Sequence, residues 1–321
     1  MSNNKVLLTT RHVVDNSEHV SLNLNHLYRY CDDLIHPNFL HWIHIFPFDL
    51  FSLPFRERLH FITILDVTSF CYWPEPKWAV TYGGNTSDGT MALVASLAKG
   101  IEDGYPLTDF GYLSQMPMSD FDNVFNKKGT MPLKSDRLKI LHETGRIVSN
   151  KFGGEFDHIV KLSKNDALVM LGLIVKFIPG FADTTIFEGK EVFFYKKAQL
   201  LISDIHYLFG AHDASYHFHN ISKLTACADY KLPQVLRQHG ILEYSEELEL
   251  AIDCCRFLSA NSKEEIEIRA NTIWAVEEIK NNLRARGLMV ESCQINDYLW
   301  LESQHNDRFD KPYHRVITTF Y

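Results

Sequence analysis

The sequence predicts a mainly α-helical protein with a small β element in its first third. In several long segments, apolar residues recur at three- and four-residue steps, the spacing that places side chains on one face of a helix. Short runs of β-branched and aromatic residues are fewer. Hydrophobic residues make up 45% of the 321 residues, which is enough for a sizeable core. We therefore expect a folded helical chain rather than a disordered one.

The predicted elements follow in chain order. Residues 62–72 mix β-branched and aromatic residues and predict a strand, and residues 78–82 before Gly83-Gly84-Asn85 predict one arm of a hairpin. Helices are predicted over residues 138–152, 168–175, 196–209 and 266–283, and a closing strand over 316–321.

The segment 266–283 has the clearest two-sided pattern. Its apolar positions, expected to face the core, are Ile266, Ile273, Val276, Ile279 and Leu283. Its charged positions, expected to face solvent, are Glu265, Glu267, Glu277 and Lys280.

We expect residues 1–321 to form a single helical unit, which could divide into two lobes at a soft boundary. The boundary is placed near residues 106–132, which are rich in loop-forming residues. Neither internal repeats nor a long linker separates the two sides.

Composition narrows the classes of partner. The formal net charge is −8, which argues against a protein that binds a nucleic acid polymer through a cationic face. The longest apolar run, residues 167–178, contains Lys176 and is too short to cross a bilayer. The six cysteines form no Cys-x-x-Cys pair, as expected for reduced thiols in a cytoplasmic protein. A small-molecule partner fits these observations, and the oligomeric state stays open.

Residues 228–237 hold the most informative polar group, Asp229. It precedes Tyr230 and Lys231, and Pro233 lies in the first turn of an expected helix. Asp229 is therefore either the N-cap of that helix or a catalytic carboxylate that points into a pocket.

Two other polar-aromatic segments are candidate parts of a binding site. Tyr72 lies in Phe-Cys-Tyr-Trp-Pro, which is either core or a stacking platform for a flat heterocycle. Lys196 opens the helix predicted at 196–209, where a lysine is either solvated or receives a phosphate or carboxylate.

Near the C-terminus, Asn296 and Asp297 precede Trp300 and could bind a base edge or a ribose hydroxyl. His217 and His219 are separated by one residue and lack further ligands at metal-site spacing, so no metal is expected.

Six stretches, taken together and in order, resemble the queuosine salvage protein family. They are residues 66–75, 137–156, 186–204, 228–237, 267–269 and 312–315. The resemblance implies a helical fold like that of the helix-hairpin-helix DNA glycosylases. It also implies hydrolysis of queuosine 5′-monophosphate to queuine and ribose 5-phosphate.

The resemblance also implies roles for single residues. Asp229 matches the family's catalytic aspartate, and Lys196 matches the lysine of its Phe-Tyr-Lys stretch. Asn296 and Asp297 lie where the family binds the base or ribose, and Cys227 stands where relatives carry a phenylalanine beside the base. His41 or His44 corresponds to a pocket histidine, and we place His44 in the site.

The chemistry agrees with these assignments. Cleavage of an N-glycosidic bond passes through an oxocarbenium-like state, which an ionised Asp229 would stabilise. A 7-deazapurine leaving group needs a proton donor away from the missing N7, and Asp297 is the candidate. No cofactor is required. The alternatives are a DNA base-excision glycosylase, disfavoured by the net charge, and a non-catalytic deazapurine-binding protein.

Overall fold

The structure is a computed structural model that describes residues 4–34, 38–125, 131–304 and 311–321. It confirms the mainly helical fold, in which small two-stranded sheets accompany the helices. By its internal contacts the chain divides into two compact units. Unit 1 comprises Met1–His44, Asp183–Gln199 and Asn220–Ile317, and unit 2 comprises Ile45–Ala182, Leu200–His219 and Thr318–Tyr321.

The soft boundary predicted near 106–132 lies within the second of these units, and the single-domain organisation stays a prediction. Among the described residues, none of the helices combines the length and the apolar character needed to cross a membrane.

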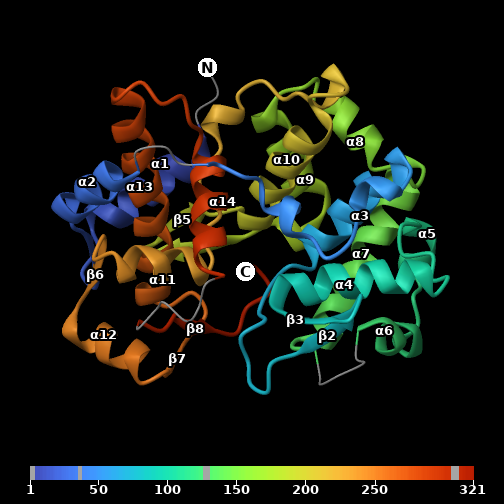
Figure 1. Ribbon diagram of the computed structural model, residues 1–321, viewed down its shortest axis with the longest axis horizontal. Helices are drawn as coiled ribbons and strands as arrows, with labels where there is room; N and C mark the ends of the chain where they lie inside the picture. Colours follow the sequence, from blue (N-terminus) through green and yellow to red (C-terminus); the bar gives the residue numbers. More distant parts are fainter. Residues whose placement is uncertain (1–3, 35–37, 126–130, 305–310) are drawn as a thin grey trace. The chain divides into compact units, whose positions relative to one another are not determined.

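Unit 1 is built from helices and six short strands among its described residues (Figure 1). Its elements are α1 (Lys5–Asp15), β1 (Val20–Leu22), α2 (Leu24–Asp33), η1 (Trp42–Ile45), β4 (Thr184–Phe187), β5 (Lys190–Phe193), the start of α10 (Lys196–Phe209), η5 (Ile221–Lys223), α11 (Lys231–Gln238), β6 (Leu242–Tyr244), α12 (Glu246–Asp253), β7 (Phe257–Leu258), α13 (Lys263–Ala285), α14 (Ser292–Glu302) and β8 (Arg315–Val316).

Helix α13 forms the centre of unit 1, where α1, α2, α11 and α14 all contact it (Figure 1). Its five predicted core residues are buried, as expected, at 0–1% exposure. Three of them, Val276, Ile279 and Leu283, pack in one hydrophobic cluster with apolar residues of α2, α11 and α14.

The prediction that the charged face of α13 meets solvent was wrong. Its four members are buried: Glu265, Glu267, Glu277 and Lys280. Glu267 Oε2 accepts the backbone N–H groups of residues 18–20 at 2.6–3.1 Å. Lys280 Nζ donates to Glu277 Oε2 at 2.5 Å. Buried charges persist where they find such partners, and the helical period does not reveal whether a partner will pack there.

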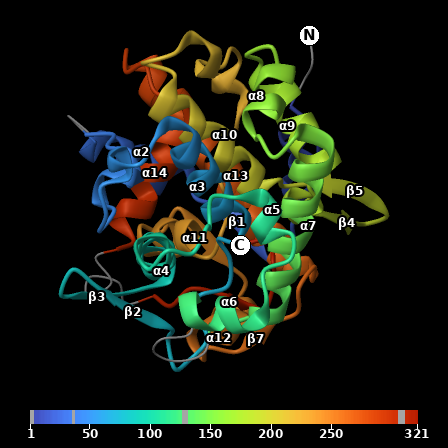
Figure 2. The same cartoon turned by 90° about the vertical axis from the view of Figure 1, so that its right-hand side faces the viewer.

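The strands of unit 1 pair in three two-stranded sheets. β1 pairs antiparallel with β6, and β4 with β5 in a hairpin that Figure 2 shows from the side. β7 and β8 pair in parallel. Of the closing strand predicted at 316–321, only Val316 is in a strand, and the backbone carbonyl of Tyr321 instead accepts the N–H of Cys71 within unit 2.

Unit 2 is mostly helical in its described residues. Its elements are η2 (Leu50–Ser52), α3 (Phe55–Val67), β2 (Ala79–Tyr82), β3 (Asn85–Asp88), α4 (Gly89–Glu102), α5 (Phe110–Leu113), α6 (Met118–Phe125), α7 (Lys134–Phe152), α8 (Asp157–Leu162), α9 (Ala167–Phe177), η3 (Pro179–Phe181), the rest of α10 and η4 (Ala214–Tyr216).

The strand predicted at 62–72 was wrong, because residues up to Val67 continue α3. Ile62, Thr63 and Ile64 are all buried in this helix, and the hydroxyl of Thr63 donates to the carbonyl of Leu59. Burial on every side overrides the β preference of branched side chains.

The hairpin prediction was confirmed. β2 and β3 pair antiparallel, with Tyr82 opposite Asn85. Gly83 and Gly84 connect them with φ of 55° and 83°, the positive values that a tight two-residue hairpin turn requires.

The predicted helices at 138–152 and 168–175 lie in α7 and α9, and the helix predicted at 196–209 is α10 itself. Gly145 brings α7 against α5, which Figure 2 shows beside it. A Cβ at this position would lie 2.5 Å from the backbone nitrogen of Ser114 and 2.6 Å from the carbonyl oxygen of Phe110. Only glycine allows the two backbones this approach.

Candidate active site

Asp229 lies just before α11, and its carboxylate caps that helix. Oδ1 accepts the backbone N–H of Lys231 at 2.8 Å and that of Leu232 at 3.1 Å. Oδ1 thus makes capping hydrogen bonds to this helix, although Tyr230 is the residue that directly precedes it. The other oxygen, Oδ2, makes no hydrogen bond to any residue that the structure describes, although the side chain is only 7% exposed. Capping and catalysis are compatible, since they use different oxygens.

Helix α14 places the predicted polar pair beside the Asp229 loop. Asn296 Oδ1 accepts the backbone N–H of Cys227 at 2.9 Å, and Asn296 Nδ2 donates to Asp297 Oδ1 at 3.2 Å. All three side chains are buried. The N–H of Cys227 fixes the orientation of the amide, because it can only donate. Asn296 therefore presents a donor to Asp297, and Asp297 accepts it.

Two tryptophans and a histidine complete this cluster. The rings of Trp42 and Trp300 meet edge to face with centroids 5.6 Å apart. Asp297 Oδ2 lies 3.4 Å from the backbone N of Trp42 and 3.7 Å from Nε2 of His41. The expected residue His44 is exposed, whereas His41 is the histidine beside Asp297. Both oxygens of Asp297 thus face N–H donors, from Asn296 and from the backbone of Trp42.

Lys196 begins α10 and is 7% exposed. Asp183 occupies the start of this helix: its Oδ2 accepts the N–H of Lys196 at 3.2 Å, and its backbone carbonyl accepts those of Phe194 and Tyr195. The carboxylate of Asp183 therefore binds the backbone N–H of this helix start and not the ammonium of Lys196. Lys196 Nζ has no hydrogen bond or ion pair to a described residue, so its ammonium is available to an anion.

Arg269, in the N-terminal half of α13, connects the start of α10 with the segment that precedes Asp229. Its guanidinium binds both oxygens of Asp183, at 3.0 and 2.5 Å, and Nε donates to the carbonyl of Ala228 at 3.2 Å. His314 lies in the same surroundings, where burial, reinforced by Arg269, lowers the pKa of the imidazole to about 3. The histidine is therefore neutral at pH 7.

Tyr72, the remaining predicted residue, belongs to unit 2. It stacks on Trp78 with ring centroids 6.5 Å apart, and the guanidinium of Arg137 lies over it at 5.0 Å. Arg137 also donates to the carbonyls of Thr68 and Phe70. Burial raises the pKa of Tyr72. Within its unit, Tyr72 is part of a packed aromatic cluster.

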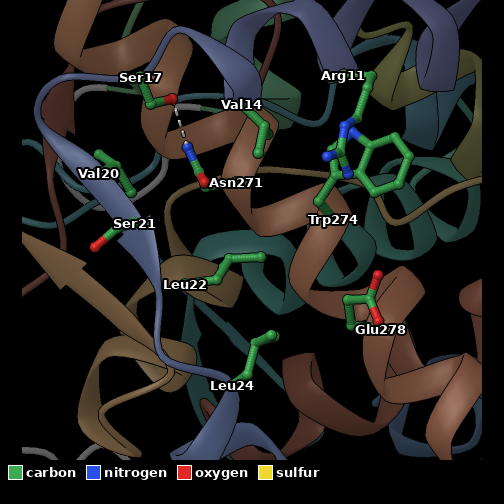
Figure 3. A pocket seen from close by; sticks show the side chains of 10 residues that line it. All are labelled: Arg11, Val14, Ser17, Val20, Ser21, Leu22, Leu24, Asn271, Trp274 and Glu278. Atoms are coloured by element: carbon green, nitrogen blue, oxygen red, sulfur yellow. Dashed lines mark hydrogen bonds between the residues drawn. The ribbon is translucent and has the colours of Figure 1, made fainter.

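A surface pocket of about 350 Å³ lies elsewhere in unit 1, between α1, β1 and α13 (Figure 3). The guanidinium of Arg11 lies 4.9 Å from the ring centroid of Trp274, and Asn271 Nδ2 donates to Ser17. None of the predicted site residues lines this pocket. No group of three or more His, Cys, Asp or Glu side chains in the described part of the chain is arranged to hold a metal ion.

Unit 1 thus brings together the segments 41–42, 227–229 and 296–300 in one buried polar cluster, the candidate site. Sequence reasoning missed Trp42 as a member, although its place beside His41 was a usable signal. It also missed Asp183, which has no motif around it and acquires its role only through Arg269.

Comparison with known proteins identifies relatives along most of the chain. The family model described as queuosine salvage protein matches residues 53–321. A relative from Sphaerobacter thermophilus is 39% identical over 267 residues, covering 83% of this chain and 82% of the relative. One from Mus musculus is 34% identical over 281 residues, with 83% and 82% covered.

A relative from Dictyostelium discoideum is 28% identical over 329 residues and covers 98% of this chain and 97% of its own. All three are named queuosine 5′-phosphate N-glycosylase/hydrolase. The predicted resemblance is therefore confirmed, and this chain belongs to the queuosine salvage protein family.

Proposed function

We propose that this protein hydrolyses the N-glycosidic bond of queuosine 5′-monophosphate and releases queuine for salvage into tRNA. The observation that carries the proposal is Asp229, a buried carboxylate with one oxygen fixed by a helix and the other available. The names of the relatives supply the substrate.

In the proposed mechanism Asp229 stabilises the positive charge that develops on the ribose. The two N–H groups that bind Oδ1 hold the carboxylate in place. Oδ2 then faces the cation without needing to reorganise, which is how a preorganised charge lowers a barrier. The C1′–N bond breaks with its electron pair on the base, which takes up a proton. Water then adds to C1′ of the ribosyl cation and loses a proton, which gives ribose 5-phosphate and free queuine.

The base would lie against the cluster of α14. We propose that Trp42 and Trp300 supply aromatic surface, and that Cys227 forms the wall beside the base. Asp297 accepts hydrogen bonds on both oxygens, so it suits recognition of an N–H edge of the base. His41, 3.7 Å from Asp297, is then the nearest group able to carry the proton that the leaving base needs.

Lys196 is proposed to bind an anionic part of the substrate, since its ammonium is buried and available. The likeness to helix-hairpin-helix DNA glycosylases and a cytoplasmic location remain proposals. The mainly helical fold and the cysteine pattern support them.

The test is release of free queuine from queuosine 5′-monophosphate by the wild type, Asp229→Asn and Asp166→Asn. Asparagine caps a helix as well as aspartate, so neither substitution should change the melting temperature. Asp166 is the matched control, because its Oδ1 caps α9 through Leu168 and Val169 at the same 2.8 and 3.1 Å. We expect Asp229→Asn to lose about a hundredfold or more in kcat and Asp166→Asn to match the wild type.

Equal release by wild type and Asp229→Asn would remove Asp229 from the proposed role. Binding of queuosine 5′-monophosphate by calorimetry with no release would identify a binding protein instead. Release of bases from duplex DNA would favour the DNA glycosylase alternative.

A further inference from the structure

We propose that the buried ion pair of Arg269 and Asp183 positions two residues of the site, holding Asp229 and Lys196 in a fixed arrangement relative to each other. The inference rests on the proposed function and assigns a role to two residues that contact no substrate in it. Both side chains are nearly inaccessible, at 2% and 1% exposure.

The first step is the geometry at Arg269. Its two terminal nitrogens bind the two oxygens of Asp183 side by side, and its Nε donates to the carbonyl of Ala228, the residue before Asp229. The planar guanidinium fixes the angles between these bonds, which a flexible ammonium does not. One rigid group therefore determines where the Asp229 loop begins.

The second step is the geometry at Asp183. The oxygen that binds Arg269 Nη2 also accepts the backbone N–H of Lys196, and the backbone carbonyl of Asp183 accepts the two preceding N–H groups. The start of α10 is thus attached to the same ion pair. The Ala228 carbonyl and the Lys196 N–H are connected through only two side chains.

Stability alone does not account for a buried ion pair at this position. Taking a carboxylate and a guanidinium out of water is costly, and an apolar pair of similar volume often gives equal or greater stability. The same two segments are also joined by Gln199, whose Oε1 accepts the N–H of Thr225 at 2.8 Å and whose Nε2 donates to the carbonyl of Phe194. Gln199 therefore already connects the start of α10 with the segment before Asp229. Arg269 adds the fixed angles between its hydrogen bonds to Asp183 and to the carbonyl of Ala228.

The consequence is specific to the chemical step. A displacement of about 1 Å between reacting groups can reduce a rate by about a hundredfold. Replacing the pair should therefore lower kcat much more than it changes the melting temperature, and it should act through Asp229.

The experiment compares the wild type with Arg269→Lys and with the double substitution Arg269→Met with Asp183→Leu, in queuine release at saturating substrate. Arg269→Lys keeps the buried charge but loses the bidentate contact. The double variant removes both charges of the pair and leaves Glu265, whose Oε1 lies 3.6 Å from Arg269 Nη1, so its melting temperature is measured beside its kcat. The control is Lys280→Arg, a charge-retaining change in the buried Glu277–Lys280 pair of the same helix.

We expect kcat to fall about thirtyfold to a hundredfold in both test variants, and less than about threefold in the control. Each substitution is then repeated in Asp229→Asn. If Arg269 acts through Asp229, the added loss there is less than about threefold, because the group being positioned is already disabled.

Two outcomes overturn this inference and leave the proposed function intact, provided that the wild type releases queuine. In the first, the test variants are as active as the control. In the second, each test variant lowers kcat by the same factor in Asp229→Asn as in the wild type. Failure of the wild type to release queuine overturns the proposed function, and the inference with it. If Arg269→Lys does not fold, the double variant alone decides, since its melting temperature is measured beside its kcat.

Discussion

Replacing Asn296 by aspartate tests the hydrogen bonding that organises the candidate site. In the wild type, Asn296 accepts the N–H of Cys227 and donates to Asp297 at 3.2 Å. Asn296→Asp keeps the acceptor but replaces the donor by a second carboxylate oxygen. Two buried carboxylates then face each other where an amide and a carboxylate did.

The magnitude follows from the separation. Two unit charges 3.2 Å apart repel by about 5 kcal/mol at an effective dielectric constant of about 20. Keeping one carboxyl protonated instead costs about 1.4 kcal/mol per pH unit above an ordinary pKa of about 4, or about 4 kcal/mol at pH 7. The lower-cost state is a shared proton, so the pKa of the pair in the folded variant is raised.

The sign of the pH dependence is therefore set. The folded variant keeps a proton that its unfolded chain releases above about pH 4, so its stability relative to the wild type falls as pH rises. Near pH 4 the introduced carboxyl group is protonated and donates as the amide did, so the two proteins should be similar. The deficit should grow to about 4 kcal/mol at pH 7 and level off near pH 8.

The assay is urea denaturation followed by tryptophan fluorescence from pH 4 to pH 8. The matched control combines Asn296→Asp with Asp297→Asn, which restores one charge and one donor. It should recover stability at pH 7 without recovering queuine release. A deficit in Asn296→Asp that does not vary with pH would refute the hydrogen-bond arrangement at this site.

Four other substitutions test packing and charge balance by urea denaturation. Glu267→Gln removes the charge that three backbone N–H groups share and should lower the free energy of unfolding by about 2–4 kcal/mol; a loss below about 1 kcal/mol would contradict the contact. Gly145→Ala should lower it by about 2–4 kcal/mol through the clash with α5, whereas Gly172→Ala, with open space around it in α9, should raise it by about 0.5–1 kcal/mol. Burial, reinforced by Arg269, lowers the pKa of His314 to about 3, so the free energy of unfolding should fall as pH drops from about 6.5 toward 3. His314→Gln should make this fall smaller. An unchanged dependence on pH in the variant would contradict the role of His314.

The helices were predictable because their apolar periodicity is a local property. Helix α10 begins and ends at the predicted residues, and α7 ends where Gly153 adopts φ of 65°. The β2–β3 turn was predictable for the same reason, since two adjacent glycines permit backbone angles that other residues resist. Family membership was also readable, because six short stretches kept their order along the chain.

Burial of polar groups was not predictable in this way. The charged face of α13 reads as solvent-exposed from its period, yet Glu267 receives N–H groups from residues 18–20, far away in the chain. Residues 62–67 read as a strand, yet they form part of α3, where apolar surroundings on all sides suit a helix as well.

The candidate site shows the same division. The sequence by itself indicated Asp229, Asn296 and Asp297 as candidate site residues, because their types and neighbours favour that interpretation. Only the tertiary structure decided that one oxygen of Asp229 accepts the N–H groups of α11 while the other has no partner among the described residues, and that His41 rather than His44 faces Asp297. The reason is physical: residue type sets which hydrogen bonds a side chain can make, whereas long-range packing sets which partners come within about 3 Å.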